Sequence, residues 1–353
     1  MFKRRVLITG STGYIGHALV RFIHAHADLF HDFEFFTADN DLRAEWVTSC
    51  GGCSLTDYEE VPPHYADDLS IYLLFRNILK EVHPSVIVHL ASQPSAPYSE
   101  RDAYSRIYTQ KNNLAMLQNI LYGSRDLKLS PAVIVTTTTG IPGAPSSAIL
   151  EEPMANLAGS SYHVSRGFDS ANLGLAARQW GFRCLELRTS IVYGVHVDDV
   201  MEPVTRLDWD FFFGTVVHRF LVSSLVSVPI PIYGKGSQKK PIIALRDVVM
   251  SLANAILRSQ DMAPGHEIMN QVTECLPVYQ IADKIGGEVR HVPNPRVENE
   301  EHQMEIRNEK FLKLLNIIPT TLSRELHSLT TSVDIGKIPH KDFDRIFKGA
   351  YHS

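Results

Sequence analysis

A glycine-rich turn between a short apolar strand and a helix is the feature that most constrains this chain. Residues 6–9 form a β-branched apolar segment, and 10–16 follow with glycine at the first, fourth and seventh positions. Apolar residues at helical spacing then run over 17–27, and a second apolar strand over 33–38 ends at Asp39. Strand, glycine turn, helix, strand and acid, in this order, predict a dinucleotide-binding βαβ unit.

The glycine turn and the acid define the predicted cofactor site. Glycines let the backbone approach a pyrophosphate closely, and free N–H groups at the following helix N-terminus attract its charge. A carboxylate at Asp39 accepts hydrogen bonds from the adenosine ribose and repels a 2′-phosphate, which favours NAD over NADP, while nearby Arg43 weakens that preference. The predicted cofactor contacts are Gly10, Thr12, Gly13, Tyr14, Ile15, Gly16, Asp39, Asn40, Arg43, Asp68, Leu69, Leu90, Ala91, Tyr162 and Arg166.

Strands and helices continue to alternate through the first half of the chain. The sequence predicts helices over 69–81, 104–122 and 160–180, and strands over 86–90, 133–135 and 184–187. This alternation predicts an α/β fold with a doubly wound, parallel sheet of the Rossmann type. Asp68 and Leu69 stand at the first of these helix starts, where they either reach the adenine or cap the helix.

The pattern changes after about residue 195, which predicts a second, smaller lobe. Residues 195–219 mix acids with aromatics, 229–238 is rich in proline and glycine, and 242–257 returns to a strand and a helix. We therefore expect an NAD-binding domain over 1–194 and 240–262, and a substrate-binding lobe over 195–239 and 263–353.

The composition bounds the partners and the compartment. The chain has 353 residues, a net charge of −5 and no apolar stretch of membrane-spanning length, so neither nucleic acid nor a membrane is an expected partner. Its four cysteines include one C-x-x-C, at Cys50 and Cys53, without a second pair at zinc spacing. This pattern predicts no metal site and a reducing, cytoplasmic compartment.

A tyrosine and a cation, Tyr162 and Arg166, lie four residues apart and therefore share one face of the expected helix over 160–180. Together with the glycine turn, and with Thr138 at the end of the preceding strand, this pattern resembles the extended short-chain dehydrogenases, the NAD-dependent epimerase/dehydratase family. Longer stretches resemble one branch, the UDP-sulfoquinovose synthases: SAPYS at 95–99, YTQKNN at 108–113, SYH at 161–163, VYGV at 192–195, FGT at 213–215, IYGKG at 232–236, NQVTE at 270–274 and VPNPRVE at 292–298.

The resemblance implies an enzyme that modifies a nucleotide sugar through oxidation at C4. In that branch, C4 of UDP-glucose is oxidised with hydride passing to NAD, water leaves across C5 and C6, sulfite adds at C6, and the ketone is reduced. Tyr162 matches the general base, which needs a cation nearby because the pKa of a free tyrosine is about 10. Thr138 matches a hydrogen-bond partner of the same oxygen, and His163 either moves a proton during elimination or is structural.

Three positions near the expected reaction site depart from the branch, and they keep other functions open. Arg166 replaces a lysine; it stays charged and can still lower the pKa of the tyrosine, but it cannot relay a proton. Ile141 stands near the place of a carboxylate, and Pro94 replaces an arginine. One alternative is therefore a nucleotide-sugar 4-epimerase or oxidoreductase without the sulfite step. Another is a non-catalytic protein that binds NAD or a nucleotide sugar.

A UDP-linked sugar needs donors for its diphosphate and a surface for its base. Lys240, Arg219 and Arg296 are the diphosphate candidates, each with a solvated surface charge as the alternative. Tyr233, between glycines, packs either against the uracil or within the core. Gln93, Ser95 and Tyr98 follow a strand end, where ligands meet doubly wound sheets, and are expected near the sugar.

A homodimer is the expected assembly. Many relatives pair two long helices across a dimer, and the apolar faces of 104–122 and 160–180 fit such an interface. The same faces could instead be buried within the monomer.

Overall fold

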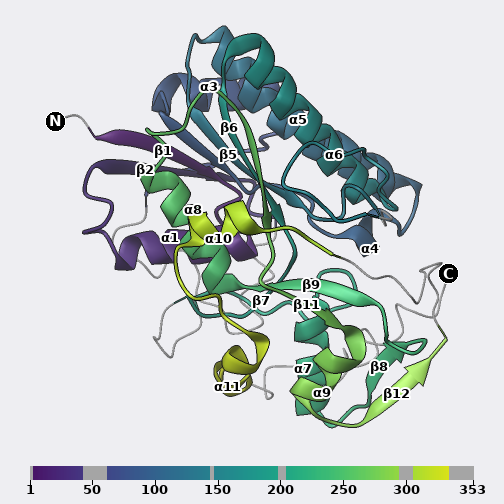
Figure 1. The fold of residues 1–353 in the computed structure, drawn as a ribbon. Helices are drawn as coiled ribbons and strands as arrows, with labels where there is room; N and C mark the ends of the chain where they lie inside the picture. Colours follow the sequence, from purple (N-terminus) through teal and green to yellow (C-terminus); the bar gives the residue numbers. More distant parts are fainter. Residues whose placement is uncertain (1–2, 43–61, 144–146, 198–203, 294–304, 334–353) are drawn as a thin grey trace.

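A parallel seven-stranded sheet forms the centre of the molecule, in the strand order β10-β6-β5-β4-β1-β2-β3 (Figure 1). The computed structural model describes residues 3–42, 62–143, 147–197, 204–293 and 305–333. The strands are β1 (Arg4–Thr9), β2 (Phe33–Asp39), β3 (His64–Ala66), β4 (Val86–His89), β5 (Ala132–Thr138), β6 (Arg183–Thr189) and β10 (Gly265–Gln271). The predicted doubly wound α/β fold is confirmed, with the strand order reversing on either side of β1.

Helices cover both faces of this sheet (Figure 1). One face carries α3 (Tyr72–Val82), α5 (Ala103–Asp126) and α6 (Ser161–Trp180). The other carries α1 (Tyr14–Ala25), α8 (Leu245–Leu257) and α10 (Glu309–Leu315), with α8 packed against both of its neighbours. A short helix, α4 (Ala96–Ser99), follows β4 and touches α5 and α6.

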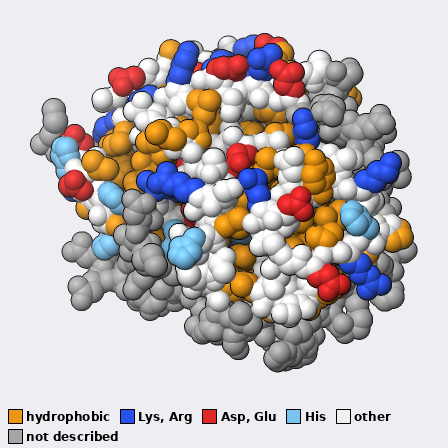
Figure 2. Space-filling model, turned by 60° about the horizontal axis from the view of Figure 1, so that its bottom comes forward, with side chains coloured by type: hydrophobic (Ala, Val, Ile, Leu, Met, Phe, Trp, Pro, Cys, Tyr) orange, Lys and Arg blue, Asp and Glu red, His pale blue; other side chains and the backbone are white. Residues whose placement is uncertain are grey.

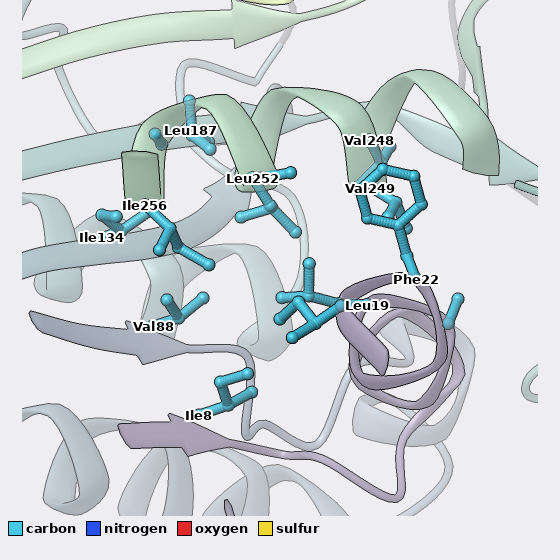
Figure 3. Packing of buried hydrophobic residues seen from close by; sticks show 14 of the residues in the cluster. Ile8, Leu19, Phe22, Val88, Ile134, Leu187, Val248, Val249, Leu252 and Ile256 are labelled. Atoms are coloured by element: carbon cyan, nitrogen blue, oxygen red, sulfur yellow. The ribbon is translucent and has the colours of Figure 1, made fainter. Parts of the chain in front are cut away.

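The core follows from the two-residue period of the buried strands. In β1, Val6 and Ile8 point to the α1–α8 side, while Leu7 points to the α3–α5 side. Figure 3 shows Leu19 of α1 and Leu252 of α8 meeting over the strands on the first of these sides. Burying each such leucine contributes about 2 kcal/mol, so the two helices are held on the sheet by ordinary apolar packing.

A second lobe lies beyond one end of the large sheet (Figure 1). It has a three-stranded sheet, β11-β9-β7, and a two-stranded one, β12-β8, around its own apolar cluster. Its elements are β7 (Ile191–Tyr193), α7 (Val216–Leu225), β8 (Ile230–Tyr233), β9 (Lys239–Ala244), β11 (Glu274–Pro277), α9 (Val278–Ile285), β12 (Val289–Val292) and α11 (Leu322–Ser332).

The structure departs from the expected lobe boundaries at three strands and one helix. Residues 191–193, expected in the NAD-binding domain, form β7 of the three-stranded sheet, and α10, expected in the second lobe, packs against α8 on the large sheet. Residues 265–271, expected in the second lobe, form β10 and pair in parallel with β6 at the edge of the large sheet. Residues 240–244, expected in the NAD-binding domain, lie in β9 and pair with β7 and β11. Strands β9 and β10 mix polar with apolar residues, so periodicity alone does not tell which sheet each of them joins. The division into lobes otherwise remains a prediction.

The surface in Figure 2 mixes side chains of all kinds. On its described part, basic and acidic groups are interspersed with apolar ones rather than gathered into a patch of one sign. Within the described residues, no helix is both long and apolar enough to cross a membrane.

Candidate cofactor and active site

The glycine turn after β1 brings three chain segments into close contact. Gly10 has a φ of +76°, and a Cβ there would lie 2.7 Å from the Cα of Ala91, after β4. A Cβ on Gly16 would lie 2.8 Å from the carbonyl carbon of Gly10. Helix α1 begins at Tyr14, and its N-cap Gly13 supplies no side-chain cap. Because Gly13 has no side chain to accept from the first N–H groups of α1, these groups remain available for an anion. That they hold a pyrophosphate stays a prediction.

Asp39, at the end of β2, lies beside this turn. Its Oδ2 accepts a hydrogen bond from the Thr12 N–H at 3.1 Å, and its Oδ1 accepts one from the Asp41 N–H at 3.1 Å. A carboxylate held here fits the ribose of a dinucleotide whose pyrophosphate lies on the turn. Asn40 is exposed, with its Oδ1 accepting from the Leu42 N–H at 3.3 Å. Arg43 lies outside the described residues.

The remaining cofactor candidates surround the end of β4. The Leu90 N–H donates to the Thr9 carbonyl at 3.0 Å, and Leu90 and Ala91 are half-buried. Asp68 is exposed, and its Oδ1 accepts from the Ser70 N–H at 2.9 Å. Leu69 is buried. Helix α3 begins only at Tyr72, so Asp68 and Leu69 lie in the turn before the helix rather than at its first residues.

Arg206, which the sequence did not single out, reaches the glycine turn from the other lobe. It is 5% exposed, its Nη1 donates to the Thr12 carbonyl at 3.2 Å, and its Nε pairs with Asp208 at 2.9 Å. The neighbouring Thr205 hydroxyl donates to the Tyr14 carbonyl at 2.8 Å, and the Tyr14 hydroxyl donates to the Gly194 carbonyl. A buried cation therefore lies beside the turn. Arg206 comes from a segment without a periodic pattern, so the sequence carried no signal for this contact.

The N-terminus of α6 is fixed by three side chains. Ser160 is the N-cap, and its hydroxyl accepts from the His163 N–H at 3.3 Å. The Ser99 hydroxyl accepts from the Tyr162 N–H at 3.1 Å, and Glu100 accepts from the Ser161 N–H at 2.6 Å. Because these groups satisfy the first N–H groups of the helix, the segment after β4 sets the position of Tyr162.

Arg166 lies one helical turn after Tyr162 and is almost completely buried. Its Nη1 is 2.7 Å from Oδ2 of Asp169, and its Nη2 donates to the Thr136 carbonyl in β5. Burial raises the pKa of Tyr162 above its ordinary value of 10.0, because the charge of Arg166 opposes this effect only in part. The arginine does favour the phenolate, as expected, but burial outweighs it.

Thr138 lies at the end of β5, and Gly140, just after this strand, is close to the His163 ring. Thr138 is 7% exposed, and its hydroxyl accepts from the Gly140 N–H at 3.1 Å. A Cβ on Gly140 would lie 2.7 Å from Nε2 of His163. The His163 ring meets the Tyr162 ring edge to face, with centroids 5.0 Å apart, and its Nδ1 is 2.7 Å from the Ser160 hydroxyl. His163 is thus held between the strand end and the tyrosine.

Asn113 is a second buried residue that the sequence did not single out as a site residue. From α5, its Oδ1 accepts from the Gln93 N–H at 2.7 Å, and its Nδ2 donates to the Gln93 carbonyl at 3.1 Å. The same Nδ2 lies 3.1 Å from the Ser165 hydroxyl in α6. Asn113 belongs to the YTQKNN stretch at 108–113, so the resemblance to the UDP-sulfoquinovose synthases was the sequence signal that could have identified it. Asn113 links the segment after β4 to the residue next to Arg166.

The predicted sugar-binding residues meet an aromatic segment of the second lobe. The Ser95 hydroxyl donates to the Phe212 carbonyl and accepts from the Tyr98 N–H at 3.0 Å. The Tyr98 ring stacks on Phe213 with centroids 5.9 Å apart, and the Arg101 guanidinium lies 4.8 Å from the Tyr98 ring centre. These contacts join the two lobes beside the N-terminus of α6.

The predicted diphosphate and uracil contacts lie on separate elements. Arg219 is on α7, with its guanidinium 5.4 Å from the Phe211 ring centre. Tyr233 ends β8, and Lys240 lies in β9; both are half-buried. Arg296 lies outside the described residues, as do Cys50 and Cys53. Within the described part of the chain, no group of three or more His, Cys, Asp or Glu side chains could hold a metal ion.

Comparisons with known proteins identify the family of the chain. The model of the NAD dependent epimerase/dehydratase family matches residues 6–270. A chloroplastic UDP-sulfoquinovose synthase of Spinacia oleracea is 29% identical, over 96% of this chain and 77% of that protein. A UDP-sulfoquinovose synthase of Sulfolobus acidocaldarius is 30% identical, over 67% of each.

A solved structure shows the same fold. The UDP-glucuronic acid 4-epimerase from Bacillus cereus, in complex with UDP-glucuronic acid and NAD, superposes with a TM-score of 0.72 at 19% identity, over 93% of this chain and 98% of that one. The glycine turn, Asp39 and the Tyr162 helix therefore stand in a fold that is known to hold NAD. This chain is a member of the NAD dependent epimerase/dehydratase family, whose enzymes use NAD.

Proposed function

We propose that this protein oxidises C4 of a nucleotide sugar, most simply a UDP-hexose, and passes through a 4-keto sugar. The observation that carries the proposal is the placement of Tyr162. Its helix is capped by Ser99 and Glu100 from the segment after β4, and a buried cation lies one turn further on. A tyrosine with a nearby cation, placed at the carboxyl-end side of the sheet in a fold that holds NAD, is suited to remove a proton from a sugar hydroxyl.

The residues that would hold the cofactor are those around the glycine turn. The N–H groups at the start of α1 face the pyrophosphate position, Asp39 fits the ribose hydroxyls, and Leu90 and Ala91 flank the turn. Arg206 adds a positive charge beside it. When bound, NAD accepts a hydride from a carbon centre.

The protein's part in the oxidation is to move one proton. The Tyr162 phenolate takes the proton of the C4 hydroxyl as the C4–H bond breaks, so a C=O bond forms at C4. Thr138, whose hydroxyl already accepts from the Gly140 N–H, can donate its own proton to the C4 oxygen. Returning the hydride to C4 reverses these steps, and Tyr162 then gives the proton back.

The sugar and its base are expected at the junction of the two lobes. Gln93, Ser95 and Tyr98 would face the sugar, because Ser95 and Tyr98 also contact the Phe212–Phe213 segment of the second lobe. Arg219, Lys240 and Arg296 remain proposed donors to the diphosphate, and Tyr233 a proposed neighbour of the base. The substrates named for the relatives, UDP-sulfoquinovose synthase and UDP-glucuronic acid 4-epimerase, support a UDP-linked sugar.

Two outcomes can follow from the ketone. The similarity to the UDP-sulfoquinovose synthases favours loss of water across C5 and C6 and addition of sulfite. Ile141, which is 1% exposed, favours the second candidate, a 4-epimerase, because an apolar side chain can neither take the C5 proton nor protonate the leaving oxygen. Elimination would then rely on His163, whose ring lies against that of Tyr162, or on water.

The test is to incubate the NAD-loaded protein with UDP-glucose in deuterated buffer, with and without sulfite. Mass spectrometry detects deuterium or a sulfonate in the sugar, and chromatography detects a C4 epimer. Deuterium or sulfonation supports the elimination route, whereas an unlabelled epimer supports the second candidate. Turnover that persists unchanged in Tyr162→Phe would contradict the proposal. If no nucleotide sugar turns over, a binding protein without catalysis is the better account.

We also propose that the protein is a homodimer through the outer faces of α5 and α6. Tyr104 and Ile107 on α5 are 69% and 56% exposed, and Phe168 on α6 is 45% exposed. The helices pack on each other within the monomer, yet these side chains still point to solvent. Exposed apolar side chains on two adjacent helices are typical of a helical dimer interface.

A further inference from the structure

Asp169 stands on the same face of α6 as Tyr162 and Arg166. The three residues are at positions i, i+4 and i+7 of the helix, a spacing that places them in one row. The Asp169 side chain is fully buried, and its Oδ2 is 2.7 Å from Nη1 of Arg166. No hydrogen bond within the described part of the chain reaches either Asp169 oxygen, so Arg166 is the group that compensates this carboxylate.

The pair fixes where the arginine points. Nη1 faces Asp169 on α6, and Nη2 donates to the Thr136 carbonyl in β5, so each terminal nitrogen has a partner other than Tyr162. A guanidinium is planar and cannot swing one nitrogen toward Tyr162 without moving the other two. A lysine in this place would carry a single rotatable ammonium instead. The orientation of the cation is thus set by Asp169 as well as by the helix.

We propose that Asp169 is a positioning residue, which holds the Arg166 guanidinium against β5 and offsets its charge, and so limits how readily Tyr162 acts as a base. The inference deepens the proposed function, on which it rests. The reactivity of Tyr162 would then depend more on the bound cofactor and substrate than on the charge of Arg166. Arg166, which replaces the lysine of the branch, and the buried carboxylate of Asp169 therefore act as one unit.

The surroundings of the pair contain few other charges. Burial, together with Arg166, lowers the pKa of His89 in β4 to about 3, so this imidazole is neutral. In β6, Glu186 is compensated separately by Arg188 at 3.0 Å and by His266 of β10 at 2.9 Å. His163 lies beside the Tyr162 ring on α6 itself.

Because His89 is neutral and Glu186 is compensated by its own partners, the charges that act on Tyr162 are those of Arg166 and Asp169. Arg166 lowers the pKa of Tyr162, and Asp169 raises it. Burial raises the pKa of Asp169 to about 7 in spite of Arg166, with Glu186 adding to the rise. Above that pH the carboxylate is mostly ionised and cancels part of the cation's effect.

The test is Asp169→Asn, which keeps the size of the side chain and an acceptor for Arg166 but removes the charge. The ionisation of Tyr162 is followed by NMR on isotope-labelled tyrosine with saturating NAD, and Tyr162→Phe assigns the signal. We expect the titration midpoint of Tyr162 to move to lower pH. The acid limb of kcat/KM should move in the same direction, and Asp169→Glu should stay closer to the unmodified protein.

Two further variants separate this role from folding. Asp247→Asn changes another fully buried carboxylate, on α8, and should leave the Tyr162 midpoint where it is. Arg166→Met combined with Asp169→Met replaces the buried pair by apolar groups, which proteins often tolerate better than loss of one partner. Here the midpoint should move to higher pH, because the loss of the cation outweighs the loss of the anion.

A Tyr162 midpoint that is the same in Asp169→Asn, or in the double variant, as in the unmodified protein would overturn the inference. So would an equal shift in Asp247→Asn. The titration needs no sugar substrate. Absence of turnover on every nucleotide sugar, combined with the expected shifts, would therefore count against the proposed function and leave the role of Asp169 standing.

Discussion

The guanidinium of Arg206 donates to the carbonyl oxygen of Thr12 at 3.2 Å, and so joins the second lobe to the glycine turn. Because the turn is where the pyrophosphate of a dinucleotide would lie, this buried cation should strengthen cofactor binding. Its charge is shared with Asp208, at 2.9 Å, which reduces the effect without removing it.

Arg206→Met should therefore weaken NAD binding by about tenfold, the usual cost of losing one hydrogen bond to a charged group. Isothermal titration calorimetry gives the Kd. Arg125→Met is the matched control, because Arg125 stacks over Trp180 at the far end of α5, 4.6 Å from the ring centre. Equal affinities in the two variants would show that Arg206 plays no part in holding the cofactor.

Gly10→Ala should destabilise the protein and abolish NAD binding. Alanine at a φ of +76° is strained, and its Cβ would also press on the backbone of Leu90 and Ala91. Gly181→Ala separates the two effects, since Gly181 has a φ of +67° with nothing within 4 Å of an added Cβ. We expect a loss of about 1 kcal/mol at Gly181 and clearly more at Gly10, measured by chemical denaturation. Similar losses would mean that the turn can open to admit a side chain.

Asp247 should make stability depend on pH. Burial raises its pKa from 3.8 to about 6, although hydrogen bonds from Thr320 oppose the rise. The folded protein therefore holds this proton more tightly than the unfolded chain. The stability it contributes is fully present below pH 3.8 and is lost as the pH rises through 6.

Asp247→Asn removes this dependence. Its free energy of unfolding, relative to the unmodified protein, should therefore increase by about 3 kcal/mol as the pH rises from below 3.8 to above 6. Denaturation curves at the two ends of that range measure the difference. A constant difference at both ends would show that the carboxyl group does not titrate in this window.

Ile107→Glu should convert a dimer to monomers, because it places a charge on the exposed apolar face of α5. Ile318→Glu is the control, since Ile318 is 84% exposed after α10 and lies outside the proposed interface. Light scattering during size-exclusion chromatography gives the mass of each variant. If the unmodified protein is already a monomer, the dimer proposal is wrong.

The sequence predicted the parts of the fold that depend on local pattern. The glycine turn, the acid at Asp39 and the strand–helix alternation need only short-range spacing, and the parallel sheet follows from them. The membership of β10 in that sheet depends on which strand it meets in the folded protein, and the spacing of its mixed polar and apolar residues carries no such information. Its placement had to come from the structure.

The candidate site also has residues that the sequence predicted and residues that only the structure brought to it. Tyr162 and Arg166 were predicted as site residues because their spacing places them on one face of a helix. Asp169 lies on the same helical row, at i+7 from Tyr162, so the sequence contained its position but not its burial or its pairing with Arg166. Arg206 comes from a segment without periodicity and reaches the glycine turn only through the tertiary fold.

The central claim, that Tyr162 supports oxidation of a nucleotide sugar at C4, is tested most directly by single-turnover absorbance of the bound nicotinamide. NAD-loaded protein is mixed with UDP-glucose carrying hydrogen or deuterium at C4, and a panel of other UDP-sugars follows if needed. We predict transient formation of NADH that is slower with deuterium at C4 and absent in Tyr162→Phe. NADH formation that is unchanged in Tyr162→Phe, or none with any sugar of the panel, would contradict the account.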